Sequence, residues 1–168
     1  NNSTPIISGT AENGTIISLF LGSDIIGTTK SDSSVGTFSV IPSSPLSDAE
    51  YTLTVTATDE AGNTSVPSAG LNITIDTTAP AAPVISTTTA LTNDNTPTIE
   101  GTAEAGSTVE LFSGSDSLGT VTAAENGTFS ITSSVLPDEI YTLTVTATDE
   151  AGNTSVPSEG LSITIDTT

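Results

Sequence analysis

The chain of 168 residues contains no cysteine, histidine, arginine, methionine or tryptophan. Without cysteine it can form neither a disulfide framework nor a thiolate metal site. Without histidine, cysteine or arginine, the only side chains available for acid–base catalysis are carboxylates. A pair of catalytic carboxylates also needs a cleft and a substrate platform, which is usually aromatic, and aromatic residues make up only 4% of the chain. We therefore predict that the chain is not an enzyme.

Positive charge is almost missing as well. One lysine stands against 20 acidic residues, so the formal net charge is -19 at pH 7. Nucleic acids and anionic lipids are bound through clustered Lys and Arg side chains, so we predict that neither is a partner. A surface of this kind attracts cations, and it repels itself unless something neutralises its carboxylates.

Long apolar runs are absent too. No stretch approaches the roughly 18 consecutive apolar residues that a membrane span requires, so we predict no membrane insertion. The chain does not open with a signal peptide, and we expect Asn1 to be an internal position of a longer polypeptide.

What the chain does contain is a long internal repeat. The segment Tyr51–Ser68, YTLTVTATDEAGNTSVPS, recurs unchanged at Tyr141–Ser158. Shorter matches are ITIDTT at 73–78 and 163–168, GTAENG at 9–14 against GTAEAG at 101–106, and GTFSV at 36–40 against GTFSI at 127–131. The period is about 90 residues. We therefore predict two modules, 1–78 and 79–168, joined around residues 76–83 by a semi-rigid linker that contains proline.

Alternation of apolar and polar residues predicts β-strands. In Tyr141–Thr148, the residues Tyr, Leu, Val and Ala alternate with four threonines, so one face of the strand is apolar and the other carries hydroxyl groups. Turn residues recur every 8 to 12 residues or so, as in all-β sandwiches. Tyr51 and Tyr141 are placed like the tyrosine corner of an immunoglobulin sandwich. The predicted fold is all-β, with tandem immunoglobulin-like β-sandwich modules of Greek key topology. We expect four phenylalanines in the cores: Phe20, Phe38, Phe112 and Phe129.

The two copies differ at their beginnings. Before its GTAE element the second copy has residues 79–100, enough for a first strand, whereas the first copy has only residues 1–8. We predict that the first module lacks its opening strand and exposes a sheet edge. A piece of a longer repeat array is the simpler interpretation. Strand exchange with another chain at this edge is the alternative.

Several motifs together resemble a known family. They are GTAEAGSTVELF, the GTFS strands, YTLTVTATDEAGN and the DTTAP linker, and they cover essentially the whole chain. In order and spacing they resemble the bacterial Ig-like repeats of giant adhesins, the large RTX-type and biofilm-associated surface proteins of Gram-negative bacteria. The resemblance implies an extracellular location on the bacterial surface and a role as a structural stalk in cell adhesion and biofilm formation. It also implies that the partners are neighbouring repeats of the same chain and that calcium stiffens the stalk after export.

The expected topology allows calcium ligands to be placed. In an Ig-like Greek key, the last strand ends at one pole, while the loops between strands B and C and between strands F and G lie at the other. Asp76 follows the last strand of the first module, whereas Glu104 and Asp149 fall in those loops of the second. With Asn153 and a linker carbonyl, they could supply the six to eight oxygens that Ca²⁺ prefers. The equivalent residues are Glu12, Asp59 and Asn63 in the first module, with Asp166 facing whatever module follows. Asp and Asn also occur in turns for backbone reasons alone, and that interpretation stays open.

Other functions compete with the stalk. The first is a carbohydrate- or receptor-binding Ig-like module, which usually carries exposed aromatic residues on its loops. The second is a filament subunit assembled by strand donation, motivated by the incomplete first module. The third is ice binding by the threonine rows at 52–58 and 142–148, although β-branched threonine also suits the solvent face of an ordinary strand.

Overall fold

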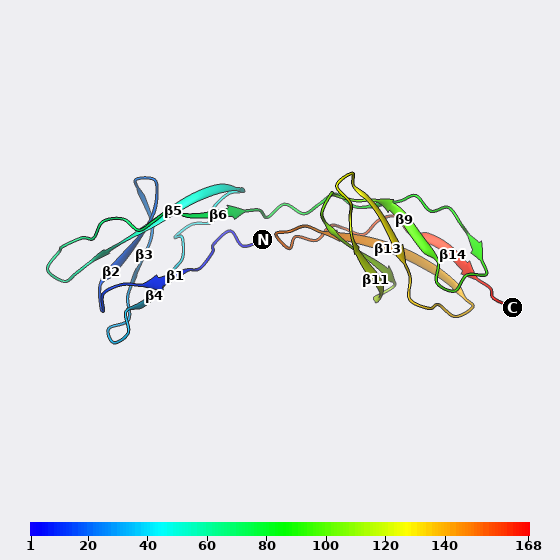
Figure 1. The fold of residues 1–168 in the computed structure, drawn as a ribbon, viewed down its shortest axis with the longest axis horizontal. Coiled ribbons are helices and arrows are strands. Elements are labelled where there is room, and N and C mark those ends of the chain that lie inside the picture. The colour runs from blue at the N-terminus through cyan, green and yellow to red at the C-terminus, as the bar shows by residue number, and fades with distance from the viewer. The chain divides into compact units, whose positions relative to one another are not determined.

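The computed structural model describes residues 1–168 and consists of β-strands and loops (Figure 1). The chain divides into two compact units, Asn1–Thr77 and Thr78–Thr168, each with its own hydrophobic core. Each unit is a sandwich of two β-sheets, which confirms the predicted all-β fold. No helix with the length and hydrophobicity to cross a membrane is present.

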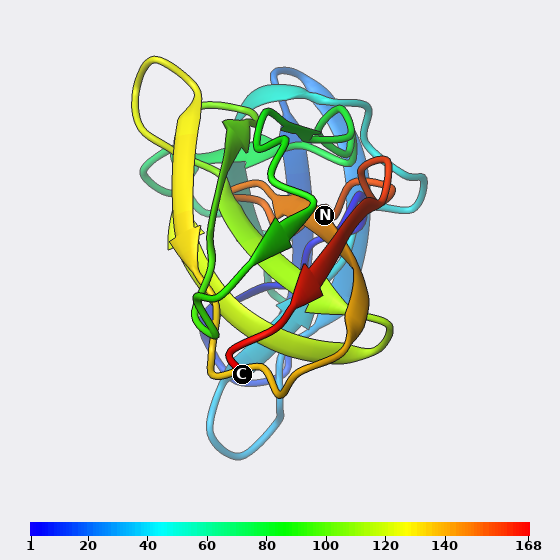
Figure 2. The ribbon, with the colours of Figure 1, turned by 90° about the vertical axis from the view of Figure 1, so that its right-hand side faces the viewer.

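Unit 2 has a five-stranded sheet, ordered β11-β10-β13-β14-β8, and a three-stranded sheet, ordered β12-β9-β7. Its strands are β7 (Val84–Ile85), β8 (Leu91–Thr92), β9 (Thr98–Thr102), β10 (Thr108–Ser113), β11 (Asp116–Thr122), β12 (Thr128–Thr132), β13 (Ile140–Thr148) and β14 (Leu161–Ile165). All pairs are antiparallel except β8 with β14. Figure 2 views unit 2 from the side of the C-terminus, with β14 in red at the front. The opening segment of the unit therefore contributes one short strand to each sheet.

The core of unit 2 follows the period of two in its strands. Leu143, Val145 and Ala147 of β13 are fully buried, while the threonines between them lie on the other face of the sheet. The other large buried residues come from five of the remaining strands and one loop: Ile99, Val109, Leu111, Leu118, Phe129, Ile131, Leu136, Ile163 and Ile165. Burial of these apolar side chains is the main force that holds the two sheets together.

Unit 1 has a four-stranded sheet, ordered β3-β2-β5-β6, and a two-stranded sheet of β1 and β4. Its strands are β1 (Ile7–Thr10), β2 (Ile16–Leu21), β3 (Asp24–Lys30), β4 (Thr37–Val40), β5 (Ala49–Thr58) and β6 (Leu71–Ile75). They correspond in order to β9–β14, and no strand of unit 1 corresponds to β7 or β8. The predicted absence of an opening strand is confirmed. As a result, β1 and β6 are edge strands.

Both units contain a tyrosine corner, as predicted. The hydroxyl of Tyr51 donates to the carbonyl of Ser47 at 2.9 Å, and that of Tyr141 donates to the carbonyl of Pro137 at 3.1 Å. Each bond ties the start of the long strand β5 or β13 to the preceding loop. Burial of Tyr141 raises the pKa of its hydroxyl, and the negative charges of Glu139 and Asp138 raise it further. This donor therefore keeps its proton at neutral pH.

Candidate functional site

The loop after β13 in unit 2, like the loop after β5 in unit 1, contains an Asp–Asn pair joined by the same two hydrogen bonds. The carboxylate of Asp149 accepts one hydrogen bond from the Asn153 backbone N–H and a second from its side-chain amide, both at 2.8 Å. Asp59 and Asn63 form the same two bonds at the same distances. Gly152 takes φ 84° between them, a conformation that a residue with a Cβ rarely adopts. The DEAGN sequence therefore folds locally into a tight turn that fixes its first carboxylate.

The loop between β9 and β10 carries the second predicted acidic group. The backbone carbonyl of Glu104 accepts from the hydroxyl of Ser107 at 2.7 Å, while the Glu104 side chain is exposed. In unit 1 the Glu12 carbonyl accepts from the hydroxyls of Thr15 at 2.9 Å and Ser31 at 2.7 Å. The turn is thus held by the backbone of the glutamate, which leaves its carboxylate in solvent.

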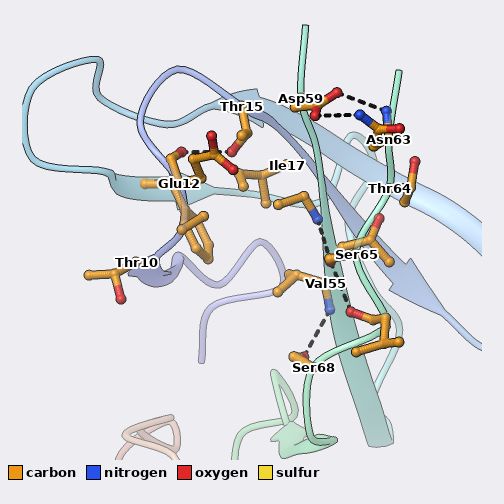
Figure 3. Close-up of a pocket in the computed structure, with 15 residues that line it drawn as sticks. Thr10, Glu12, Thr15, Ile17, Val55, Asp59, Asn63, Thr64, Ser65 and Ser68 are labelled. Carbon is orange, nitrogen blue, oxygen red and sulfur yellow. Dashed lines mark hydrogen bonds between the residues drawn. The ribbon is translucent and has the colours of Figure 1, made fainter. Parts of the chain in front are cut away.

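In unit 1 the structure brings the predicted acidic residues together. Glu12, Asp59 and Asn63 line one pocket of about 500 Å³, and Figure 3 shows Glu12 on one side and the hydrogen-bonded Asp59 and Asn63 on the other. Its lining also includes apolar residues, among them Ile17 and Val55. In unit 2 the same two loops share one end of the sandwich, because the first residue of β10 pairs with the last residue of β13.

The residues that follow the last strands lie at the opposite end of each unit. Asp166 comes directly after Ile165, whose N–H donates to the carbonyl of Glu139 just before β13 begins. In unit 1, Ile75 pairs with Ala49 at the start of β5, and Asp76 follows it. Neither aspartate therefore joins the acidic loops of its own unit. The calcium ligands predicted for the junction come from both units: Asp76 from unit 1, and Glu104, Asp149 and Asn153 from unit 2. This shared site stays a prediction.

Asp48 and Asp138, which lie just before the tyrosine corners, bind the chain that follows the last strand of each unit. One oxygen of the Asp48 carboxylate accepts from the Thr77 backbone N–H at 3.0 Å and from its hydroxyl at 2.8 Å. Asp138 binds Thr167 in the same manner. The bonds anchor the chain just after the last strand to the loop before the tyrosine corner. The signal in the sequence was the identical separation of 29 residues in the two copies.

Hydrogen bonding keeps the loop aspartates charged. The Asn63 side chain and backbone N–H hold the pKa of Asp59 below its usual value. At Asp149 desolvation raises the pKa, but the bonds from Asn153 and from the N–H groups of Gly152 and Ala151 outweigh it, so the pKa is lowered. Both groups are ionised at neutral pH, as a metal ligand must be.

The side chains that line the pocket of unit 1 offer the type of oxygen ligand that calcium binds, but one unit supplies only a few of them. Two carboxylates and an amide, all hard oxygen donors, line the pocket of unit 1. Calcium takes about six to eight oxygens, so such a site needs ligands from other residues or water. No group of three or more Asp, Glu, His or Cys side chains in the chain is gathered closely enough to hold a metal ion.

The phenylalanines divide into two classes. Phe38 and Phe129 are buried, as predicted, whereas Phe20 and Phe112 are only half-buried. All four lie on strands rather than on loops.

Comparison with known proteins identifies the modules. A model of the bacterial Ig-like domain matches residues 1–77 and 84–167, which together make up most of the chain. The chain belongs to the bacterial Ig-like domain family. Each bacterial Ig-like domain found in this way coincides with one structural unit, apart from residues 78–83 and Thr168 of unit 2.

Relatives of these bacterial Ig-like domains occur in larger proteins. The chain is 35% identical over 126 residues to Exoglucanase B of Cellulomonas fimi, a match that covers 68% of the chain but only 11% of that protein. Among solved structures, the fibronectin(III)-like modules of Clostridium thermocellum CbhA share the fold at a TM-score of 0.60 and 15% identity, over 98% of this chain and 86% of theirs. A biofilm associated protein (BSP domain) is 27% identical with a TM-score of 0.43, over 97% of this chain and 28% of that one.

Proposed function

We propose that the chain is a pair of extender repeats in the stalk of a bacterial cell-surface adhesin and that calcium stiffens the junctions between neighbouring repeats. The observation that carries the proposal is the tandem of two bacterial Ig-like domains that share an exactly repeated segment, each with an ionised Asp–Asn turn and an exposed glutamate at one end. The parent protein acts outside the cell, where it supports adhesion and biofilm formation. The chain itself has no catalytic role.

A stalk needs stiffness that a short linker does not supply. Small interfaces between domains permit them to move relative to one another. The net charge of -19 adds repulsion between neighbouring carboxylates. A cation that takes ligands from both sides of a junction would neutralise that repulsion and restrict the hinge. The proposed ligands at the internal junction are Asp76, Glu104, Asp149 and Asn153, while Glu12, Asp59, Asn63 and Asp166 serve the neighbouring repeats.

The expected affinity suits a protein that is exported. Extracellular calcium modules have dissociation constants of about 10⁻⁴ to 10⁻³ M. Such sites are empty at the calcium concentration of the cytosol and filled outside the cell. The chain would therefore stay flexible during export and become rigid afterwards.

Calcium removal tests this proposal. We expect a higher melting temperature and a longer maximum dimension in about 2 mM Ca²⁺, above the expected dissociation constant, than in excess chelator. Thermal unfolding and small-angle X-ray scattering measure the two quantities, with NaCl added to the chelator sample to match ionic strength. The calcium-dependent rise in melting temperature and in maximum dimension should be lost in Asp149→Asn. It should be kept in Glu150→Gln, which removes the same charge from an exposed neighbour. Equal melting temperature and equal length with and without calcium would remove the calcium mechanism.

Carbohydrate binding is the second candidate, favoured by the similarity to a protein named Exoglucanase B. The chain would then serve as an accessory module that holds a larger protein on a glucan. Co-sedimentation of the chain with insoluble cellulose separates the two functions, because an extender repeat stays in the supernatant.

A further inference from the structure

The long strand β13 extends beyond the strand that pairs with it. β14 pairs with β13 from Ile140 to Leu143, whereas β13 continues to Thr148. Beyond Leu143 the same edge of β13 faces the chain that returns from the turn, and this chain forms one isolated bridge, between Thr148 and Thr154, instead of a ladder. Other groups must therefore satisfy the backbone of β13 along this edge.

Two serines take the place of strand residues there. The Ser155 N–H donates to the Ala147 carbonyl at 2.8 Å, and the Ala147 N–H donates to the Ser155 hydroxyl at 3.0 Å. Ser158 forms the same two bonds with Val145, at 2.9 Å and 3.1 Å. Each serine thus satisfies both backbone groups of one β13 residue, with a hydroxyl oxygen where an antiparallel ladder would supply a carbonyl.

The spacing of the two serines prevents a regular strand. They are three residues apart, but the β13 residues that they bind are two apart, so the chain between them bulges outward. Val156 and Pro157 form this bulge and are exposed. Pro157 has no N–H, and the carbonyls of Val156 and Glu159 accept from the serine hydroxyls at 2.9 Å and 2.8 Å. The serine segment, Ser155–Ser158, therefore closes the edge of β13 and offers few backbone groups to a further strand.

Unit 1 contains a second serine segment, Ser65–Ser68, on the edge of β5. Ser65 binds Ala57 and Ser68 binds Val55 through the same pairs of bonds, at 2.9 Å and 3.1 Å in each case. Figure 3 shows Ser65 and Ser68 beside Val55. The serine hydroxyls again donate to the carbonyl of the next residue, both at 2.9 Å. The arrangement therefore belongs to the repeated sequence itself.

The strand that the serine segment covers is suited to pairing with itself. Tyr141–Thr148 is rich in β-branched residues and contains neither a charge nor a proline, as is typical of segments that pair with identical copies. The same eight residues recur at Tyr51–Thr58, and repeat proteins misassemble through such identical elements. The net charge of -19 opposes contact between chains, but screening limits its reach to about 8 Å at 0.15 M salt. Charge alone therefore does not protect this edge.

We propose that the serine segments keep β13 and β5 from pairing with the same strand of another copy of the chain. An uncovered edge of β13 would offer the N–H and carbonyl groups of Val145 and Ala147 to a second chain, as exposed sheet edges do. With the serine segment in place, all four groups are already bonded. This role is independent of the stalk function and of calcium.

Joint substitution of Ser155→Ala and Ser158→Ala in the whole chain tests the proposal, in excess chelator and about 0.15 M NaCl. In dilute solution the amides of Val145 and Ala147 should exchange with solvent at least about tenfold faster, because each loses its acceptor. As the chain is concentrated from about 10 μM to 1 mM, sedimentation velocity should show dimers. Exchange at the same two amides should then slow again, since a strand of the second chain replaces the serine segment.

Ser162→Ala is the matched control. Ser162 is an exposed serine on β14, so its loss leaves the serine segment intact and the chain should stay monomeric. Within the doubly substituted chain, exchange at Val55 and Ala57 should stay unchanged, because unit 1 keeps its own serine segment.

If the double substitution unfolds unit 2, as a loss of β-sheet circular dichroism would show, Ser155→Ala alone makes the same test at Ala147. A chain that stays monomeric although its exchange is faster would overturn the proposal, as would unchanged exchange at Ala147. Dimers in which exchange does not slow again, or equal dimerisation of Ser162→Ala, would also overturn it.

Discussion

At the scale of single residues, each unit holds its loop carboxylate through the asparagine four residues later, together with N–H groups of the turn between them. Asp59 receives two hydrogen bonds from Asn63, and Asp149 receives two from Asn153. The turn therefore depends on the ionised carboxylate as an acceptor, whether or not a metal also binds there. This structural role explains why the pair recurs unchanged in both copies, and it does not compete with the proposed ligand role, because a carboxylate accepts more than two interactions.

Replacing Asp59 by Asn should make the stability of unit 1 less dependent on pH. The pKa of Asp59 is lower in the folded chain than the ordinary value of 3.8. Its ionised form thus stabilises the fold above the pKa of the unfolded chain, and this contribution is lost as the pH falls through the folded-state pKa. We expect Asp59→Asn to lower the free energy of unfolding at pH 7 and to have a much smaller effect near pH 2, as measured by urea unfolding.

Glu60→Gln controls for the loss of one negative charge. Glu60 is the exposed neighbour of Asp59 and provides no bond to the turn that the structure records. The substitution should leave stability at pH 7 unchanged or slightly higher, because the chain is strongly acidic. If Asp59→Asn and Glu60→Gln had the same effect at both pH values, the hydrogen bonds to Asn63 would have no part in the pH dependence.

At the scale of elements, the short strand β7 decides the difference between the two sandwiches. It contains only Val84 and Ile85, yet it closes the edge of the three-stranded sheet over Gly101. A strand so short has little stability of its own and depends on the sheet that receives it. The receiving surface, rather than the sequence of β7, therefore sets its position.

Gly101→Ala should detach β7 and destabilise unit 2. The added Cβ meets the backbone carbonyl of Val84 and the ring of Phe129, whereas at Gly9 it meets only the ring of Phe38. A ring can shift within a core, but the carbonyl can move only if the ladder opens. We expect Gly101→Ala to cost about 1 to 3 kcal/mol more than Gly9→Ala. Hydrogen exchange of the Ser86 amide, which is bonded to Glu100 at 2.8 Å, should speed up. Equal costs for the two substitutions would show that the carbonyl contact has no effect.

At the scale of the whole molecule, charge is the dominant feature. The chain has a net charge of -19 and a single lysine, so nearly every long-range interaction between its charges is repulsive. Apolar burial and the hydrogen-bonded ladders must overcome this repulsion in each unit. Conditions that weaken it should therefore stabilise the chain without any specific binding.

Added salt should raise the melting temperature at pH 7 but not near the isoelectric point. Screening reduces repulsion once the Debye length falls to about 10 Å or less, at around 0.1 M monovalent salt. We expect NaCl between about 0.01 and 0.3 M to raise the melting temperature at pH 7 by a few degrees. Close to the isoelectric point of about 4.1 the same salt should have little effect. A salt effect of the same size at both pH values would contradict repulsion as the cause.

The sequence by itself determined the local features of this protein. Period-two alternation in Tyr141–Thr148 predicts a strand with one buried face, and Leu143, Val145 and Ala147 are indeed buried. The exact repeat predicts two similar sandwiches, and the acidic segments before Tyr51 and Tyr141 predict tyrosine corners. These features follow from neighbouring residues, because alternation, turn chemistry and the reach of a tyrosine hydroxyl are all short-range.

Only the tertiary structure decided which members of the repeat are covered and which carboxylates meet. Val55 and Val145 have identical neighbours in sequence, but only Val145 is fully buried. Glu12 and Asp59 line one pocket although they are far apart in the chain, whereas Asp76 lies at the opposite end of their unit. Burial and convergence depend on segments that are distant in sequence, and a local pattern carries no information about them.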